Sequence, residues 1–379
     1  MRSNRLVFFA IISLAVVAVA LLFGLRLLFV NNNPILISVL YSTEKEAWLD
    51  EVLPEFEGQV NGRPVELTLK KMGSQEIYRA IADGTEQPEI ISPASFLQIS
   101  LLEDESAKKF GSPLVDMTDP VNCRSVVETP LVLVAWRERA EALGWLDSSN
   151  ANMWEDLQKA VVSPTGWRDY GHPQWGFVKF GHTDPFKSNS GLMTILLITY
   201  DYFNKTKGLT SNDILTDDYG RWFGELAGYT AVGDSTGTFM QEIVAFGPSK
   251  YDMVAVYEST AIEQADNAAG RYGQLNVYYP PATIMSDHPF CVLKADWVTS
   301  DEAQAAQEFI DYLLSRPVQE KALAFGFRPA DATISLDQPG SPFETYKANG
   351  IEIGLPAEIE VPPGDVLDTL LRFWERNAR

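Results

Sequence analysis

The residues best suited to ligand binding are hydroxyl side chains that directly follow predicted strands. The triplet Ser188-Asn189-Ser190 precedes an almost wholly apolar run, 192–200, and Ser and Asn are favoured where helices begin. The first N–H groups of a helix lack internal partners and lie at the positive end of its dipole. A polar turn leading into such a helix can therefore hold a polar or charged ligand. An ordinary helix cap without a ligand is the alternative on this segment alone.

Three more serines occupy equivalent positions earlier in the chain. Ser42, Ser74 and Ser92 each lie where a predicted strand ends and a helix is about to begin. The carboxyl ends of parallel strands meet at one edge of an open sheet and line a common crevice. Each serine alone could be a plain helix cap, but three successive strand ends favour a shared site.

The elements that position these residues follow a strand–helix alternation. Apolar or alternating runs predict strands at 35–40, 64–70, 89–92, 129–136, 174–180, 252–257, 274–279 and 288–293. Apolar residues at helical spacing predict helices between these strands and an amphipathic helix near the C-terminus, whose apolar face indicates core packing. This order predicts doubly wound α/β layers. A chain of 379 residues is long enough for about two such units.

Composition excludes several classes of function. The net charge of −21 argues against nucleic acid and anionic membrane surfaces as partners. The sequence contains no Walker A motif, dinucleotide fingerprint or H-E-x-x-H pair. We therefore expect no cofactor.

The N-terminus predicts a membrane anchor. A basic start, 1–5, is followed by 19 uncharged residues, 6–24, close to the ~20 needed to span a bilayer. The apolar run continues past the small residues 18–20, which favours an uncleaved anchor over a cleaved signal peptide. With Arg2 and Arg5 on the cytoplasmic side, the remainder faces outward. We expect a single-pass cell-membrane protein whose soluble part lies in the periplasm or outside the cell.

The two cysteines, Cys123 and Cys291, have two interpretations. In an oxidising compartment they could form a disulfide, but two buried free thiols agree equally well with the sequence.

The chain resembles bacterial extracellular solute-binding proteins of ABC importers over about residues 35–330. The segments that carry the resemblance are, in chain order, 42–45, 73–74, 92–95, 181–185 with 188–191, 235–237, 256–258, 288–290 and 326–329. It is most similar to the branch often fused to a von Willebrand A domain, although it carries no Asp-x-Ser-x-Ser metal motif.

The resemblance implies a type II, periplasmic-binding-protein-like fold with two α/β lobes joined by a two-strand hinge, preceded here by one transmembrane helix. The predicted parts are an anchor and linker (1–33), lobe one (34–128 and 288–379) and lobe two (129–287). The crossing strands are expected near 129–135 and 286–293. The resemblance also implies no catalysis, a small-molecule or ion ligand, a possible ABC permease partner and a monomer.

In related oxyanion binders the ligand is held by hydroxyls, by N–H groups at helix starts and by a tyrosine of the second lobe. Carried over to this sequence, those roles fall on Ser42, on Ser74, on the helix starts at Ser188 and at Ser235-Thr236, and on Tyr257. With their neighbours, the candidate ligand-binding residues are Ser42, Thr43, Ser74, Ser92, Ser188, Asn189, Ser190, Ser235, Thr236, Tyr257 and Glu258.

Carboxylates beside these positions leave the ligand class open. If Glu44, Asp184 or Glu258 faces the pocket, it would repel a fully ionised anion and favour an amine, a metal ion or a sugar hydroxyl. The neighbouring Lys45 could offset one negative charge, or the carboxylates could point to solvent.

Parts of the sequence also agree with three alternative functions: a serine hydrolase, a metal-binding protein and a tethered interaction protein. Residues 233–237 match the G-x-S-x-G nucleophile elbow, with Asp266 and His288 in hydrolase order, but 226–231 resembles a helix end rather than the required strand. His182 with Asp184 could bind a metal, although a lone loop histidine is more often hydrogen-bonded, so no metal site is predicted. A tethered interaction or sensor protein, using the cleft for a partner or peptide, is the third.

Overall fold

The computed structural model describes residues 33–147 and 152–377. The predicted anchor, 6–24, lies outside these residues. Over the described ranges, no helix combines the length and the apolar character needed to cross a bilayer.

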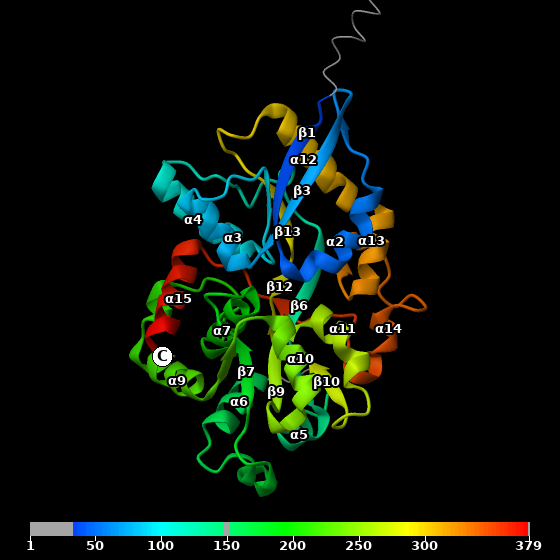
Figure 1. Cartoon of the computed structure of the whole chain (residues 1–379). Helices are drawn as coiled ribbons and strands as arrows, with labels where there is room; N and C mark the ends of the chain where they lie inside the picture. Colours follow the sequence, from blue (N-terminus) through cyan, green and yellow to red (C-terminus); the bar gives the residue numbers. More distant parts are fainter. Residues whose placement is uncertain (1–32, 148–151, 378–379) are drawn as a thin grey trace, which may run out of the picture.

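Six strands form the first sheet of the described chain, in the order β2-β3-β1-β4-β13-β5. It occupies the upper half of the view in Figure 1. β1, β3 and β4 run parallel, whereas β13 is antiparallel to both of its neighbours. The strands are β1 (Ile35–Ser42), β2 (Gln59–Val60), β3 (Arg63–Met72), β4 (Ile90–Ser92), β5 (Cys123–Ser125) and β13 (Pro289–Val292).

A second sheet, in the lower half of the view, contains seven of the described strands (Figure 1). Its order is β10-β6-β9-β7-β8, and β12 and β14 pair with the first residues of β6. β7, β8 and β9 are parallel, but β6 is antiparallel to β9 and β10. The strands are β6 (Val127–Trp136), β7 (Phe180–Thr183), β8 (Ala231–Gly233), β9 (Met253–Tyr257), β10 (Leu275–Tyr278), β12 (Met285–Ser286) and β14 (Arg328–Pro329).

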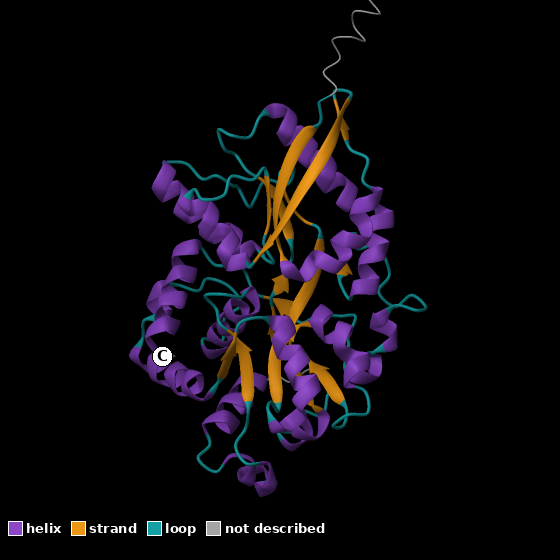
Figure 2. Cartoon of the chain, viewed as in Figure 1, coloured by secondary structure: helices purple, strands orange, loops and turns teal. Residues whose placement is uncertain are grey.

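Helices pack against both sheets, as Figure 2 shows. Those beside the first sheet are α2 (Glu46–Val52), α3 (Ser74–Asp83), α4 (Phe96–Phe110), α12 (Ser300–Leu313) and α13 (Arg316–Ala322). Those beside the second sheet are α5 (Arg137–Ala142), α6 (Met153–Val162), α7 (Asn189–Tyr202), α9 (Asp217–Tyr229), α10 (Thr236–Phe246) and α11 (Glu258–Ala268). Shorter helices are α8 (Ser211–Ile214) and α14 (Pro342–Thr345).

The chain crosses between the sheets close to the two predicted positions. It leaves the first sheet between β5 and β6 and returns to it between β12 and β13. The proposed division into lobes stays a prediction. The segment 288–379 is predicted to belong to lobe one. Three of its residues, Ile334, Phe343 and Ile351, nevertheless pack in the same hydrophobic cluster as Val134 and Val256 of the second sheet.

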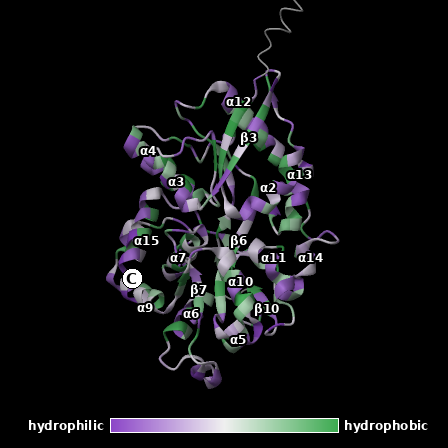
Figure 3. Ribbon diagram, in the orientation of Figure 1, coloured by the Kyte–Doolittle hydropathy of each residue, from purple (hydrophilic) through white to green (hydrophobic). Residues whose placement is uncertain are grey.

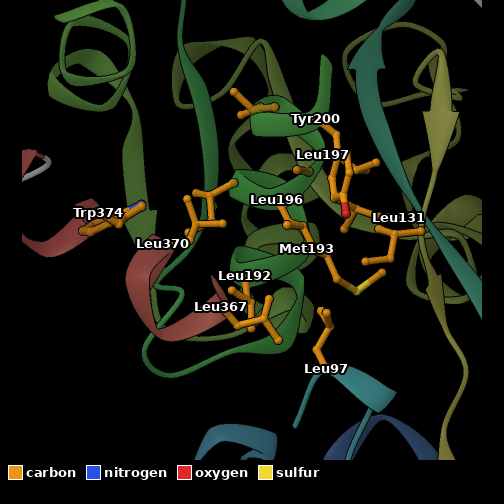
Figure 4. Packing of buried hydrophobic residues seen from close by; sticks show 14 of the residues in the cluster. Leu97, Leu131, Leu192, Met193, Leu196, Leu197, Tyr200, Leu367, Leu370 and Trp374 are labelled. Carbon is orange, nitrogen blue, oxygen red and sulfur yellow. The ribbon is translucent and has the colours of Figure 1, made fainter. Parts of the chain in front are cut away.

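The centre of the largest core is α7, which is buried on every side because its sequence is apolar almost throughout. Figure 4 shows its side chains, among them Leu196, close to Leu131 of β6 and to Leu370 of α15 (Gly364–Asn377). The ribbon of α15 alternates between hydrophobic and hydrophilic colours (Figure 3). Its apolar face is buried, which confirms the predicted core packing, and the helix packs against α4 as well as α8 and α9.

The strand predicted at 174–180 is wrong. Pro173–Trp175 forms a 3-10 helix, and β7 begins only at Phe180. Gly176 has a φ of 75°, which interrupts an extended chain. The Trp175 ring instead stacks on His172, with 3.7 Å between ring centroids, and lies 3.3 Å from the Arg139 guanidinium. Aromatic packing therefore uses Trp175, whereas Phe177, the next large residue of the predicted strand, is exposed.

Cys123 of β5 and Cys291 of β13 lie directly opposite each other and form a disulfide. The structure thus decides between the two interpretations of the cysteines.

Candidate functional site

A cleft of about 970 Å³ is lined by elements from both sheets. The 3-10 helix η1 (Thr43–Lys45) and the starts of α2 and α3 belong to the first sheet's side. The starts of α7, α10 and α11 belong to the second sheet's side. The predicted site residues that line the cleft are Thr43, Ser74, Ser188, Asn189, Ser235 and Thr236.

Hydroxyl groups connect the starts of α7 and α10. The Oγ of Ser190 is 2.7 Å from both Thr183 Oγ1 and Thr236 Oγ1, and 3.2 Å from Ser188 Oγ. Ser190 is wholly buried and does not line the cleft, whereas Ser188 and Thr236 do. Ser190 therefore positions the two helix starts beneath the lining.

Tyr257 has a similar supporting position. Its ring is wholly buried, and its hydroxyl accepts a hydrogen bond from Asn189 Nδ2 at 3.1 Å. Burial raises the pKa of Tyr257 well above its ordinary value, and the charge of Glu44 adds to this shift. The Oδ1 of Asn189 accepts from Gln98 Nε2 of α4 at 3.0 Å, which joins elements beside the two sheets. Tyr257 thus holds Asn189 in place and does not line the cleft.

On the first sheet's side, only two of the four predicted residues line the cleft. Ser74 is the first residue of α3, and its Oγ accepts from the Ala94 N–H at 3.0 Å. Ser42 and Ser92 are buried beneath the lining. The Nζ of Lys45 donates to Ser42 Oγ at 2.6 Å and to the Ser92 carbonyl at 3.0 Å. These two serines therefore belong to the floor of the cleft.

Lys45 is wholly buried in that floor. Its Nζ also lies 3.2 Å from His288 Nδ1, which can accept a hydrogen bond from it when the imidazole is neutral and Nδ1 carries no proton. Burial lowers the pKa of Lys45 to about 7. Burial, and secondarily the nearby Lys45, hold the pKa of His288 well below its ordinary value. Lys45 points into the floor and does not reach the pocket itself, but the charge of Glu44 raises its pKa, so Lys45 can offset part of that charge from beneath the lining.

Glu258 does not line the cleft. Arg328 donates to its carboxylate through Nε and Nη2, each at 2.7 Å, and the Tyr279 hydroxyl donates as well. Asp184 is also engaged elsewhere, because its Oδ1 accepts from the Phe186 N–H at 2.9 Å within a turn. Neither residue belongs to the lining of the cleft.

The nucleophile-elbow motif lacks both a triad and the buried strand that the motif requires. A short strand, β8, does precede Ser235, but none of its three residues is buried, and Ser235 has an extended, unstrained backbone. The Ser235 Oγ caps α10, accepting from the Thr238 N–H at 3.2 Å. His288 contacts Lys45 and Ser286 instead of Ser235.

The other histidine considered, His182, is buried. Its Nδ1 lies 2.7 Å from the Thr183 carbonyl, and burial lowers its pKa to about 4. Within the described ranges, no three His, Cys, Asp or Glu side chains are grouped so as to hold a metal ion.

Much of the cleft lining was not predicted from the sequence. Helical spacing could have predicted that Glu46 and Asp50, four residues apart, lie on the same face of α2. It could not have predicted that this face meets the cleft. The missed residues are Glu46, Trp48, Asp50, Lys187, Asp234, Ser259, Thr260, Glu263, Phe325, Phe327 and Tyr346.

Asp287, at the crossing between β12 and β13, should make stability depend on pH. Its Oδ1 accepts from the Phe96 N–H at 2.9 Å, and burial raises its pKa to about 8. The folded protein keeps this proton up to about pH 8, whereas the unfolded chain releases it near ~4. The associated stability is present below about pH 4 and is lost as pH rises to about 8. Asp287→Asn should remove this loss.

Urea unfolding of the wild type and Asp287→Asn at several pH values checks this expectation. Lys45 contributes in the opposite direction, because its lowered pKa makes stability rise between about pH 7 and its ordinary value. Since the charge of Asp287 raises the pKa of Lys45, the difference between the two proteins also includes a change in this contribution. Parallel pH profiles for the two proteins would contradict it.

Comparisons with known proteins agree with this architecture. A family model described as bacterial extracellular solute-binding protein matches residues 37–328. The search of curated proteins gave no match.

Solved structures resemble the chain at low sequence identity. The sulfate-binding protein SubI from Mycobacterium tuberculosis H37Rv is 17% identical, with a TM-score of 0.52 over 85% of this chain and 93% of its own. Iron-bound HitA from Pseudomonas aeruginosa is 13% identical, with a TM-score of 0.57 over 91% and 100%. A periplasmic thiamin binding protein is 13% identical, with a TM-score of 0.58 over 91% and 97%. These likenesses confirm the predicted α/β, periplasmic-binding-protein-like fold, with mixed rather than purely parallel sheets.

Proposed function

Because the chain belongs to the bacterial extracellular solute-binding protein family, we propose that it captures a small polar solute in the cleft and delivers it to an ABC-type importer. The observation that carries the proposal is that four helix starts, those of α3, α7, α10 and α11, reach one cleft. The N–H groups of a helix's first turn have no acceptor within the helix, so those that are not bonded elsewhere can donate to a ligand. In α10 the Thr238 N–H already donates to Ser235 Oγ, and in α11 the Ser259 N–H donates to Thr129 Oγ1.

Binding rather than catalysis agrees with both the family and the geometry. Ser235 has no histidine partner, the Ser74 hydroxyl accepts from the backbone, and the Thr236 hydroxyl bonds to that of Ser190. Two crossings between the sheets would act as the hinge, and the Gln98–Asn189 hydrogen bond would form as the lobes approach. We also propose that residues 1–33 tether the receptor, as a monomer, to the outer face of the cell membrane.

A bulky side chain placed in the cleft should abolish binding. Gly237, in the first turn of α10, lines the cleft, and a Cβ added there meets no atom within 4 Å. We expect Gly237→Trp to fold normally and to fill part of the site. Gly228→Trp in α9 is the matched control, because that glycine is equally open but lies outside the cleft lining.

The measurement is a thermal-shift screen of the full-length protein with oxyanions, divalent metals, amines and sugars. A ligand at 100 times its dissociation constant stabilises the folded state by about 2.7 kcal/mol, which raises the melting temperature by a few degrees. The shift should persist in Gly228→Trp and disappear in Gly237→Trp. Equal shifts in both variants would place the binding site elsewhere. No shift with any compound in the wild type would favour a tethered interaction protein.

A further inference from the structure

The cleft lining carries an excess of negative charge. Among the described residues that line it, the carboxylates are Glu44, Glu46, Asp50, Asp234 and Glu263 and the ammonium group is that of Lys187. Two of these carboxylates are neutralised locally. Glu46 pairs with Lys71 and Asp234 pairs with Lys187, each at 2.6 Å. Glu44, Asp50 and Glu263 form no ion pair with any described residue, although the charge of Glu44 acts on the buried Lys45 and that of Asp50 acts on Lys71. Their charges are therefore only partly offset, and the lining keeps a net negative charge.

Glu44 has the most restrictive position of the three. It lies in η1, between Thr43, which lines the cleft, and Lys45, which points into the floor. Its Oε2 has no exposed surface and no hydrogen-bond partner in the part of the chain that the structure describes. A desolvated carboxylate oxygen without a donor is unfavourable. Because Oε2 has no exposed surface, a ligand N–H group would supply the missing donor only once the side chain turns towards the cleft that Glu44 lines.

The helix starts by themselves would favour an anion, whereas the carboxylate of Glu44 would favour a cation. These two electrostatic effects oppose each other. Glu44 lines the same cleft as Ser74, Asn189 and Thr236, the first residues of α3, α7 and α10. Its charge is also felt by Tyr257, which lies beneath Asn189. A fully ionised oxyanion bound at these helix starts would therefore be repelled by Glu44. The helix starts remain able to bind neutral acceptors or a second, acidic group of the same ligand.

Aromatic rings support a positively charged nitrogen rather than a metal ion. The half-buried rings of Phe325 and Tyr346 line the cleft, with the more deeply buried Phe327 and Trp48 also in the lining. Aromatic faces attract ammonium groups, especially where water is excluded. In the described ranges no group of three potential ligands could hold a metal ion.

We infer that the solute is an organic cation, a protonated amine whose N–H groups bind Glu44 and whose charge is balanced by Asp50 and Glu263. This inference rests on the proposed function, because it concerns the same cleft.

Isothermal titration of the full-length protein with putrescine, spermidine, arginine, sulfate, molybdate and glucose tests it. Glu44→Gln should weaken binding of the amine by roughly 10- to 100-fold, since it removes a charge-assisted hydrogen bond. Glu51→Gln is the matched control: it makes the same change on the exposed face of α2, outside the cleft lining, and should leave affinity unchanged. The melting temperature of each variant without ligand verifies folding, and Glu44→Ala provides a second variant.

The outcomes separate this inference from the proposed function. Amine binding that is lost in both Gly237→Trp and Glu44→Gln supports the two together. If sulfate, molybdate or glucose binds instead and Gly237→Trp abolishes that binding, the receptor function stands and the cation inference is wrong. Amine binding that Glu44→Gln leaves unchanged also overturns the inference. If none of the compounds binds, both fail.

Discussion

Arg328→Met should lower the free energy of unfolding by about 3–5 kcal/mol, because it leaves a buried carboxylate without its cation. The carboxylate is that of Glu258, which is 0% exposed, and Arg328 itself is only 6% exposed. Arg328 donates to both carboxylate oxygens and to the carbonyls of Glu352 and Ile353. Methionine preserves much of the length of the side chain but none of these donors. Urea unfolding monitored by tryptophan fluorescence measures the loss.

Two further variants show whether the loss comes from the unpaired charge. Arg328→Met combined with Glu258→Gln should recover part of the stability, since glutamine can still accept from Tyr279 and carries no charge. Arg316→Met is the matched control, because Arg316 pairs with Glu320 while both side chains are about half exposed. Such surface pairs contribute about 0–1 kcal/mol. A single variant Arg328→Met as stable as Arg316→Met would contradict the argument.

The same ion pair also supports the cleft. Glu258 begins α11, whose next residues, Ser259 and Thr260, line the cleft, and Arg328 belongs to β14, which pairs with the first residues of β6. We therefore expect ligand affinity to fall together with stability in Arg328→Met. The role of Glu258 is to anchor a wall of the site.

Removing the disulfide should have an effect of similar size. Cys123 and Cys291 are 168 residues apart in the sequence, so the bond closes a long loop in the unfolded chain. The loss of chain entropy in the unfolded state then stabilises the fold by about 5 kcal/mol at most. Both cysteines are buried, so Cys123→Ala with Cys291→Ala introduces no polar group into the core. Its urea midpoint should be well below that of the oxidised wild type.

A reducing agent provides the internal control for this comparison. Dithiothreitol should lower the midpoint of the wild type towards that of the double alanine variant and should leave the variant unchanged. If the wild type unfolds at the same urea concentration with and without the reductant, the bond does not contribute as the loop length predicts.

The sequence by itself determined the features that depend on neighbouring residues. The predicted start of α7 at Ser188, and most strands and helices, are confirmed within a few residues. Helix caps and apolar periodicity act through local backbone geometry, so a short segment contains the information. Hydroxyl residues at strand ends could also be placed near one crevice, because parallel strands bring their carboxyl ends together. Thr43, Ser74, Ser188, Asn189, Ser235 and Thr236 line the cleft for this reason.

The tertiary structure decided which side chains can reach a ligand. Glu258 and Tyr257 are adjacent to a helix start, yet Arg328, 70 residues away, and Asn189, 68 residues away, occupy their polar atoms. Glu44 and Lys45 are neighbours in the sequence, but one lines the cleft and the other is buried beneath it. Local sequence sets where each backbone turn begins. The direction of a side chain depends on distant partners, because burial and hydrogen bonding are satisfied only when the whole chain has packed.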